Sequence, residues 1–191
     1  FGRRPPIAWF AADADDPFLA AHRAAGGATC GVRAGHLRLS VDAVDFDLGA
    51  LAAMPLTLGG MARYNVANLA AAALAAHAMG VAPATIASVF ARFGSRVEDN
   101  PGRLMRFDAD GVQVLVDYAH NPEGMRGLLT VAQSLRKGAG RLGVLLGHAG
   151  NREDRDVERL AEVAAEFGPA LVVVKELEGY LRGHQPGEVP G

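Results

Sequence analysis

An apolar, β-branched stretch at residues 112–116 is followed at once by polar side chains and then by a proline. The polar side chains are those of Asp117, Tyr118, His120 and Asn121, and the proline is Pro122. This order is typical of a buried parallel strand that delivers polar groups to its C-terminal edge, where open α/β sheets bind their ligands. It predicts an α/β fold with a ligand site at residues 117–122, and the residue types point to nucleotide chemistry.

A plainer alternative exists for this run. Asp117 can accept hydrogen bonds from ribose hydroxyls, and a helix that begins at Pro122 leaves backbone N–H groups free to face an anion. Alternatively, Asp117 caps that helix and His120 makes a structural hydrogen bond. The residues of the run alone leave these two interpretations evenly balanced.

Strands and helices alternate in the C-terminal half of the sequence. The patterns predict a hairpin from 104–107 and 112–117, helices at 122–136 and 153–167, and strands at 142–146 and 171–174. Strand–helix–strand units at this spacing favour a parallel sheet with right-handed crossovers. Beyond Lys175 the sequence shows no further clear helix, so we expect this domain to be truncated.

The N-terminal half lacks a long core element before residue 64. Its patterns predict a strand at 5–10, a helix capped by Asp16 with Pro17 at its first position, a hairpin from 28–32 and 36–41, and strand-like pieces at 46–48 and 56–58. An Ala-rich helix at 64–79 and a second helix at 83–93 then make an αα-hairpin. Residues 94–102 are polar and turn-rich, which indicates a linker.

Composition excludes several classes of function. The net charge of −2 provides no basic field for nucleic acid, and no apolar run approaches the roughly 20 residues of a membrane span. The single cysteine, Cys30, rules out an internal disulfide and a cysteine zinc site, and it fits a reducing cytoplasm. Because the histidines lack the spacing of metal ligands, we expect no metal site within the chain.

A Gly-rich segment at 147–150 follows a predicted strand and precedes a predicted helix. Such a segment has the geometry of a phosphate cradle, and Arg152 or Arg155 can hold a phosphate or carboxylate there. The alternative is a solvated helix start whose acidic residues favour the helix dipole. Asn151 belongs to the same loop.

Three other groups of residues are candidates. Asn65 and Asn68 share a face near the start of the Ala-rich helix, where an amide can pair with a base edge or cap the helix. Arg103 follows Pro101 and Gly102, so it can reach a phosphate from a domain hinge or be merely exposed. The carboxylates at 13, 15 and 16 suggest either a cation or, more simply, a solvated turn.

Several of these segments resemble the Mur ligase superfamily. The segment 59–72 is similar to the end of the central ATPase domain, 101–103 to the hinge with its arginine, and 117–122 to the start of the C-terminal Rossmann-like domain. Within the superfamily, the segments 13–17, 55–60 and 181–188 resemble the cyanophycin synthetase branch. The resemblance implies that 1–96 end the ATPase domain, 97–102 form a linker, and 103–191 form an incomplete Rossmann-like domain with a mostly parallel sheet.

The resemblance also implies a chemistry and a set of roles. ATP phosphorylates a carboxylate, and an amine attacks the acyl phosphate to give an amide or isopeptide bond. Asn65, Asn68, Arg103, Asp117 and Tyr118 are then expected to bind ATP, with Asn68 at the adenine, Asp117 at the ribose and Arg103 at the phosphates. Asn121, Asn151 and Arg155 are expected to bind the acceptor, beside His120 and Arg152 as catalytic residues. In the cyanophycin branch the acceptor is arginine, which is added to a poly-aspartate chain.

Other expected features of the superfamily do not appear in the sequence. The P-loop, most of the Mg²⁺ site and the carbamylated lysine are missing, and so is the ATP-grasp half of cyanophycin synthetases. We therefore expect a fragment of a cytoplasmic ligase that is inactive alone, with exposed apolar surface and a tendency to form homo-oligomers. A Mur-like peptide ligase with another amine acceptor, and a non-catalytic binding or oligomerisation module with the Mur fold, remain open.

Overall fold

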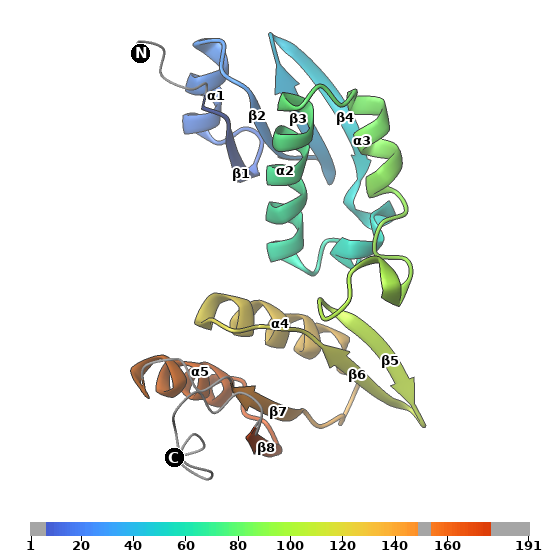
Figure 1. Cartoon of the computed structure of the whole chain (residues 1–191), viewed down its shortest axis with the longest axis vertical. Helices are drawn as coiled ribbons and strands as arrows, with labels where there is room; N and C mark the ends of the chain where they lie inside the picture. Colours follow the sequence, from blue (N-terminus) through green and yellow to red (C-terminus); the bar gives the residue numbers. More distant parts are fainter. Residues whose placement is uncertain (1–6, 149–153, 177–191) are drawn as a thin grey trace. The chain divides into compact units, whose positions relative to one another are not determined.

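A computed structural model of the chain describes residues 7–148 and 154–176. The chain divides into two compact units, Phe1–Pro101 and Gly102–Gly191, and each is considered separately below (Figure 1). No helix among the described residues is long and apolar enough to cross a membrane. The architecture is mixed α/β with parallel strand pairs, as the sequence predicts.

The first unit is built on a four-stranded sheet with the order β1-β2-β3-β4. The strands are β1 (Trp9–Asp13), β2 (Thr29–Arg33), β3 (His36–Val41) and β4 (Val44–Ala50). Strand β1 pairs parallel with β2, and the other pairs are antiparallel. Helix α1 (Pro17–Ala24) connects the two parallel strands, which need a crossover of this kind.

Local turn chemistry explains two of these connections. Asp16 caps α1 as predicted, because its side chain accepts a hydrogen bond from Phe18 N at 2.8 Å and Pro17 occupies the first turn. The predicted β2–β3 hairpin is also confirmed. Its two loop residues, Ala34 and Gly35, both have positive φ, which gives the turn a twist that matches antiparallel strands.

Short 3₁₀ helices and two α-helices follow the sheet. These are η1 (Leu51–Ala53), η2 (Pro55–Thr57), α2 (Arg63–Ala78), α3 (Pro83–Phe90) and η3 (Val97–Asp99). The strand-like piece expected at 56–58 was a wrong prediction, because η2 covers most of it. The Thr57 hydroxyl donates within this turn to the carbonyls of Leu51 and Met54, at 2.7 and 2.9 Å.

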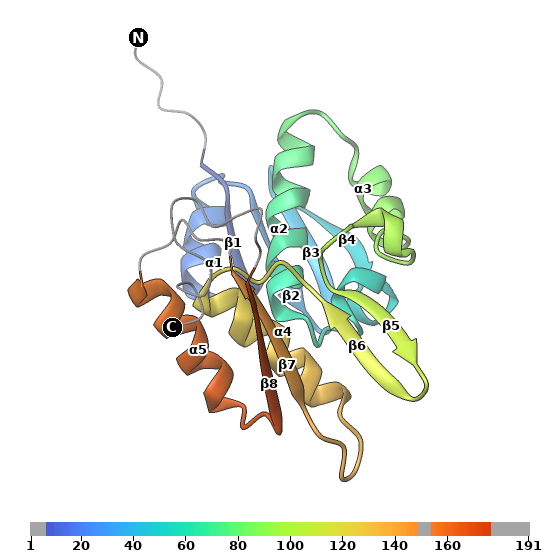
Figure 2. The same ribbon diagram turned by 60° about the horizontal axis from the view of Figure 1, so that its bottom comes forward.

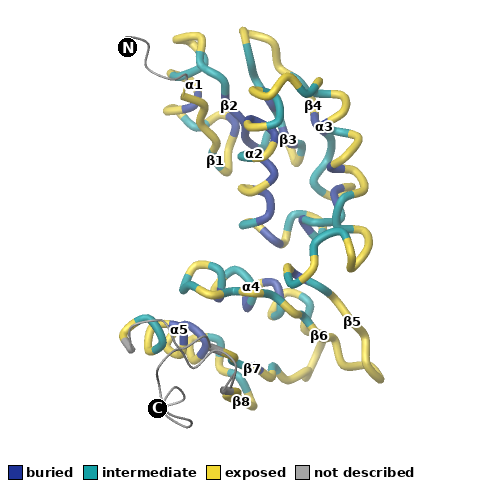
Figure 3. The backbone as a smooth tube through the Cα atoms, in the orientation of Figure 1, coloured by how far each residue is buried: buried dark blue, intermediate teal, exposed yellow. Residues whose placement is uncertain are grey.

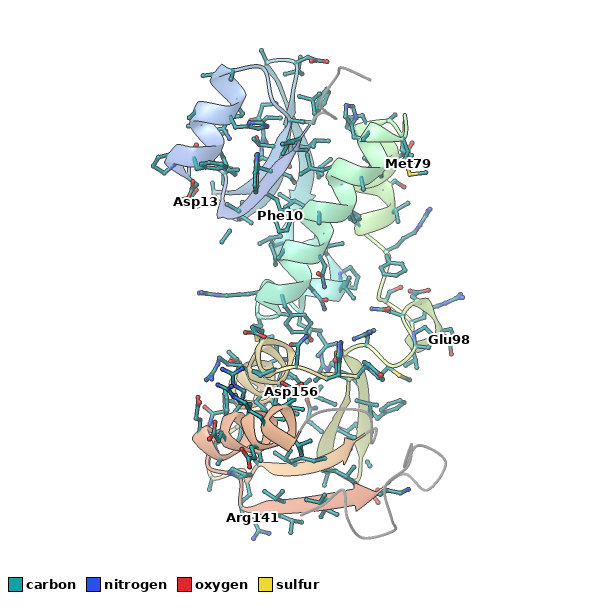
Figure 4. The ribbon with its side chains drawn as sticks, turned by 60° about the vertical axis from the view of Figure 1, so that its left-hand side comes forward. Phe10, Asp13, Met79, Glu98, Arg141 and Asp156 are labelled. Atoms are coloured by element: carbon teal, nitrogen blue, oxygen red, sulfur yellow. The ribbon has the colours of Figure 1, made fainter. Side chains whose placement is uncertain are left out.

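The core of the first unit lies between the sheet and the helices α2 and α3. Side chains alternate along the strands, so that Leu37 and Leu39 of β3 are fully buried while His36 and Arg38 face the other side. The alanines of α2 allow this helix to approach the sheet closely, and Figure 3 shows its buried stripe in dark blue. Met79 at the end of α2 is 85% exposed (Figure 4).

Cys30 of β2 provides a test of this core. Its side chain is fully buried, and desolvation raises the pKa of the thiol to about 12. Because the thiolate is the reactive form, we expect iodoacetamide to label the folded chain at pH 8 at least about 1,000-fold more slowly than the unfolded chain. Labelling rates with and without 8 M urea measure this ratio. Equal rates would show that this core is not formed.

The second unit contains a hairpin and a strand–helix layer. The hairpin consists of β5 (Met105–Ala109) and β6 (Val112–Val116), paired antiparallel as predicted. Then follow α4 (Pro122–Leu135), β7 (Gly143–His148), α5 (Asp154–Glu166) and β8 (Leu171–Glu176). Figure 2 shows β7 and β8 side by side; they pair parallel.

Helices α4 and α5 pack against each other and against β7. The core contains Met125 and Leu129 from α4, Val144 from β7, and Leu160, Val163 and Ala164 from α5. Arg126 and Glu166 form an ion pair across the two helices. The hydrogen bond from Arg126 lowers the pKa of the Glu166 carboxyl. The opposite face of β7 is open, since Leu145 is 67% exposed.

The expectation that residues 112–116 form a buried parallel strand was wrong. Among the described strands, β6 pairs only with β5, in antiparallel register. Val112, Val114 and Val116 share one face and are all exposed. A short β-branched run suits an exposed hairpin as well as a buried strand, so its composition did not distinguish the two.

Exposed apolar side chains also occur in the first unit, as expected. Trp9 and Phe18 make an edge-to-face pair with ring centroids 5.2 Å apart, and both rings are exposed. Phe10, on the edge strand β1, is exposed as well.

Candidate functional site

The candidate site lies in the second unit, where the hairpin begins and ends. Met105 is opposite Val116 in the register, so the residues just before β5 lie beside those just after β6. This places Gly102–Leu104 next to Asp117 and Tyr118. The hairpin therefore joins two predicted site residues, Arg103 and Asp117, that are separated in the sequence.

Hydrogen bonds hold the backbone on both sides of Arg103. Tyr118 N donates to the Gly102 carbonyl at 2.9 Å, and Leu104 N donates to Asp117 Oδ2 at 2.8 Å. The buried Leu104 has a left-handed backbone, with φ of 46°. This conformation is uncommon for leucine and persists because the surrounding contacts hold it.

The Asp117 carboxylate binds the chain segment before β5 and the segment after β6. Its Oδ2 accepts from Leu104 N, and its Oδ1 accepts from Ala119 N at 2.8 Å. The alternative in which Asp117 caps the following helix was wrong, because Asn121 is the N-cap of α4. Each carboxylate oxygen can accept a second hydrogen bond, so Asp117 retains capacity for a hydroxyl ligand.

Aromatic contacts link Arg103, Tyr118 and His120, which we call the Arg103 stack. The Arg103 guanidinium carbon lies 5.0 Å from the centroid of the Tyr118 ring, a cation–π distance. The His120 ring is 4.9 Å from the same centroid and tilted by 51°. All three side chains are exposed, so the stack is open to solvent.

The start of α4 adjoins this stack. Asn121 Oδ1 accepts from Gly124 N at 2.7 Å, and Pro122 occupies the first turn. A Cβ at position 124 would lie 3.1 Å from Asn121 Oδ1, so a larger residue there crowds the cap. The side-chain oxygen of Asn121 thus caps the helix. The structural hydrogen bond considered for His120 is not found among the described residues.

The predicted acceptor-binding loop is only partly within the structure. Asn151 and Arg152 lie outside the described residues. Arg155 is in the first turn of α5 and is exposed. Of the five residues expected at the acceptor site, the structure brings His120 and Asn121 together at the start of α4.

Asn65 and Asn68 lie on α2 in the first unit. Asn65 is only 4% exposed, and its Nδ2 donates to the Leu56 carbonyl at 3.0 Å. The exposed Asn68 donates through Nδ2 to Asn65 Oδ1 at 3.4 Å. The capping alternative was wrong for both residues, because Ala62 is the N-cap of α2. Asn68 is the one whose side chain reaches the surface.

A charged network that was not predicted from the sequence covers the outward face of the first sheet. Arg33 pairs with Asp15 and Asp45, and Arg38 pairs with Asp45 and Asp47. The Gly49 N–H and then His36 lower the pKa of Asp47, and hydrogen bonding to Arg33 lowers that of Asp15. The signal was present in the alternation of His36 and Arg38 with apolar residues along β3, and of Asp45 and Asp47 with apolar residues along β4.

Neither the acidic turn nor any other described cluster is suited to a metal ion. Asp13 accepts from Asp15 N, Asp16 caps α1, and Asp15 pairs with Arg33, so the three carboxylates serve different partners. Within residues 7–148 and 154–176, no three His, Cys, Asp or Glu side chains gather in a way that could hold Mg²⁺. The residues of the Arg103 stack fit an anion such as a phosphate instead.

Comparisons with known proteins agree with the resemblance. Residues 102–187 match the family described as Mur ligase, glutamate ligase domain. The chain is 29% identical over 182 residues to the cyanophycin synthetase of Synechocystis sp., which covers 95% of this chain and 20% of that protein. It is 33% identical over 209 residues to the UDP-N-acetylmuramate–L-alanine ligase of Kineococcus radiotolerans, which covers 99% and 41%.

A third relative is the UDP-N-acetylmuramoyl-L-alanyl-D-glutamate–2,6-diaminopimelate ligase of Xanthomonas campestris. It is 36% identical over 158 residues, which cover 81% of this chain and 30% of that protein. The chain spans about a fifth of the length of the cyanophycin synthetases that it matches.

Proposed function

We propose that the chain is part of an ATP-dependent carbon–nitrogen ligase, because residues 102–187 match the family described as Mur ligase, glutamate ligase domain. The observation that carries the proposal is the Arg103 stack. An exposed guanidinium on a backbone held from both sides is suited to binding a phosphate group.

The proposed reaction has two steps. A substrate carboxylate oxygen attacks the terminal phosphorus of ATP, and the bond between that phosphorus and ADP breaks. The amine nitrogen of the acceptor then attacks the carbonyl carbon of the acyl phosphate, loses a proton, and displaces phosphate. Because the reacting groups carry much negative charge, catalysis depends chiefly on positioning and charge stabilisation.

The chain's residues have distinct roles in this proposal. Arg103 binds the phosphate oxygens, and Asp117 accepts from a ribose hydroxyl with the lone pairs that its backbone bonds leave free. Asn68, held by Asn65, contacts the adenine edge. His120 takes the proton of the acceptor amine with Arg152 as its catalytic partner, while Asn121, Asn151 and Arg155 bind the acceptor. Mg²⁺ would neutralise phosphate charge when bound, and residues 7–148 and 154–176 contain no cluster suited to hold it.

Arginine is the proposed acceptor, added to an aspartate side chain of a poly-aspartate primer. The support is the similarity to cyanophycin synthetases over most of this chain. The same similarity supports the proposed domain organisation, in which 1–96 end the ATPase domain, 97–102 form the linker and 103–191 begin the acceptor domain. ATP consumption favours a cytoplasmic location, and the exposed apolar strands favour association into homo-oligomers.

The proposal is tested with the full-length gene product that contains this chain. Phosphate release from ATP is measured with a poly-aspartate primer, whose side-chain carboxylates are free, and arginine, and then with a panel of other amines. Release that requires both primer and arginine supports the proposal. Release with another amine retains the ligase chemistry but replaces the acceptor. No release from folded protein with any amine contradicts ligase activity and favours a non-catalytic module.

A further inference from the structure

The Tyr118 ring is the group that contacts the Arg103 side chain. Within residues 7–148 and 154–176, no carboxylate forms an ion pair with Arg103, while the ring centroid of Tyr118 lies 5.0 Å from its guanidinium carbon. Tyr118 is itself 62% exposed, so its ring does not pack in the core.

Stacking has a different chemical consequence from an ion pair. A carboxylate partner occupies the N–H fork of a guanidinium, and that fork is what binds phosphate. A ring contacts the guanidinium through its face and leaves the N–H groups in the plane free to donate. The Tyr118 contact therefore orients Arg103 without using the donors that a phosphate needs.

The backbone geometry directs this contact. Tyr118 N donates to Gly102 O, and the neighbouring Asp117 accepts from Leu104 N, so consecutive residues hold both flanks of Arg103. The same strand end thus fixes the Arg103 backbone and provides the ring against which its side chain lies. The remaining freedom of Arg103 is in its side chain, which the ring restricts.

We propose that Tyr118 is a positioning residue that holds the Arg103 guanidinium in the orientation that binds a polyphosphate. This inference rests on the phosphate role proposed for Arg103 and adds the residue that orders it. The contact requires an aromatic ring and not the hydroxyl, so phenylalanine can replace Tyr118 and leucine cannot.

The first experiment tests the stack in the free chain. The Arg103 side-chain Nε–Hε signal is identified in NMR spectra by its loss in Arg103→Gln. We expect an upfield ring-current shift and restricted motion of this group in the wild type and in Tyr118→Phe, and loss of both in Tyr118→Leu. Phe107→Leu, at another exposed ring of the same hairpin, is the matched control and leaves the signal unchanged. An Arg103 signal unaffected by Tyr118→Leu overturns the proposal.

The second experiment tests the consequence for binding, with inorganic tripolyphosphate as the probe. We expect Tyr118→Leu to raise the dissociation constant about two- to fivefold and Tyr118→Phe to restore wild-type binding. Binding that is equal in the wild type and Tyr118→Leu overturns the positioning role but leaves the phosphate role of Arg103 intact. Binding by the wild type that Arg103→Gln does not weaken, or no binding at all, contradicts the phosphate role and with it the inference.

Discussion

Replacing Arg103 by alanine in the full-length gene product is expected to lower kcat for ATP-dependent phosphate release by about 100- to 1,000-fold. The guanidinium is exposed, its backbone is held on both sides, and its donors are free of carboxylate partners among the described residues. Removing one well-placed donor to developing charge has effects of this size in other enzymes. Phosphate release at saturating ATP and acceptor measures the change.

Arg106→Ala is the matched control for this variant. Arg106 is an exposed arginine on the same hairpin, and the one hydrogen bond that its side chain makes to a described residue is a 3.4 Å bond to Gln113 Oε1. We expect its kcat to stay within about twofold of the wild type. Similar losses in both variants would mean that general surface charge, and not the position of Arg103, supports the reaction.

Replacing Asp117 by alanine is expected to destabilise the second unit by about 2–4 kcal/mol. The change removes the acceptors of two backbone N–H groups, those of Leu104 and Ala119, and an unsatisfied donor out of contact with water costs about 1–3 kcal/mol. Hydrogen exchange of peptides from the second unit, detected by mass spectrometry, measures the loss of protection.

Two variants sharpen this prediction. Asp108→Ala removes a carboxylate from the exposed turn of the same hairpin, where it accepts one 3.2 Å hydrogen bond from Gly111 N, and should cost less than about 1 kcal/mol. Asp117→Asn keeps one acceptor oxygen and should fall between the wild type and Asp117→Ala. Equal protection in Asp117→Ala and the wild type would contradict the structural role given to the two hydrogen bonds.

Local sequence signals predicted much of the fold. Asp16 and Pro17 start α1, and the loop at Ala34 and Gly35 closes the β2–β3 hairpin, because these residue types act through contacts with their immediate neighbours. Signals that depend on distant packing were less reliable. The valines of β6 suggested a buried strand, but they are exposed on a hairpin. The segment at 56–58 suggested a strand-like piece, but the 3₁₀ helix η2 covers most of it.

The residues of the candidate site were predicted individually from the sequence, but their arrangement in space was not. Arg103, Asp117 and Tyr118 were each identified, yet the hydrogen bonds from Leu104 N and Tyr118 N join segments more than a dozen positions apart. Extending the hairpin register beyond Met105 and Val116 would have placed these residues side by side. The stacking of the Tyr118 ring on Arg103 depends on side-chain conformation, which no sequence pattern specifies.

An acyl phosphate intermediate is detected by the transfer of a carboxylate oxygen to the released phosphate. The full-length gene product is given ATP, arginine and a poly-aspartyl primer whose side-chain carboxylates carry ¹⁸O, and the released phosphate is examined by mass spectrometry. In an acyl phosphate, one oxygen of the carboxylate bridges carbon and phosphorus and leaves with the phosphate when the amine attacks. We expect one ¹⁸O atom in each phosphate released by an enriched carboxylate. Phosphate that contains no ¹⁸O while the amide product forms would contradict the acyl phosphate mechanism.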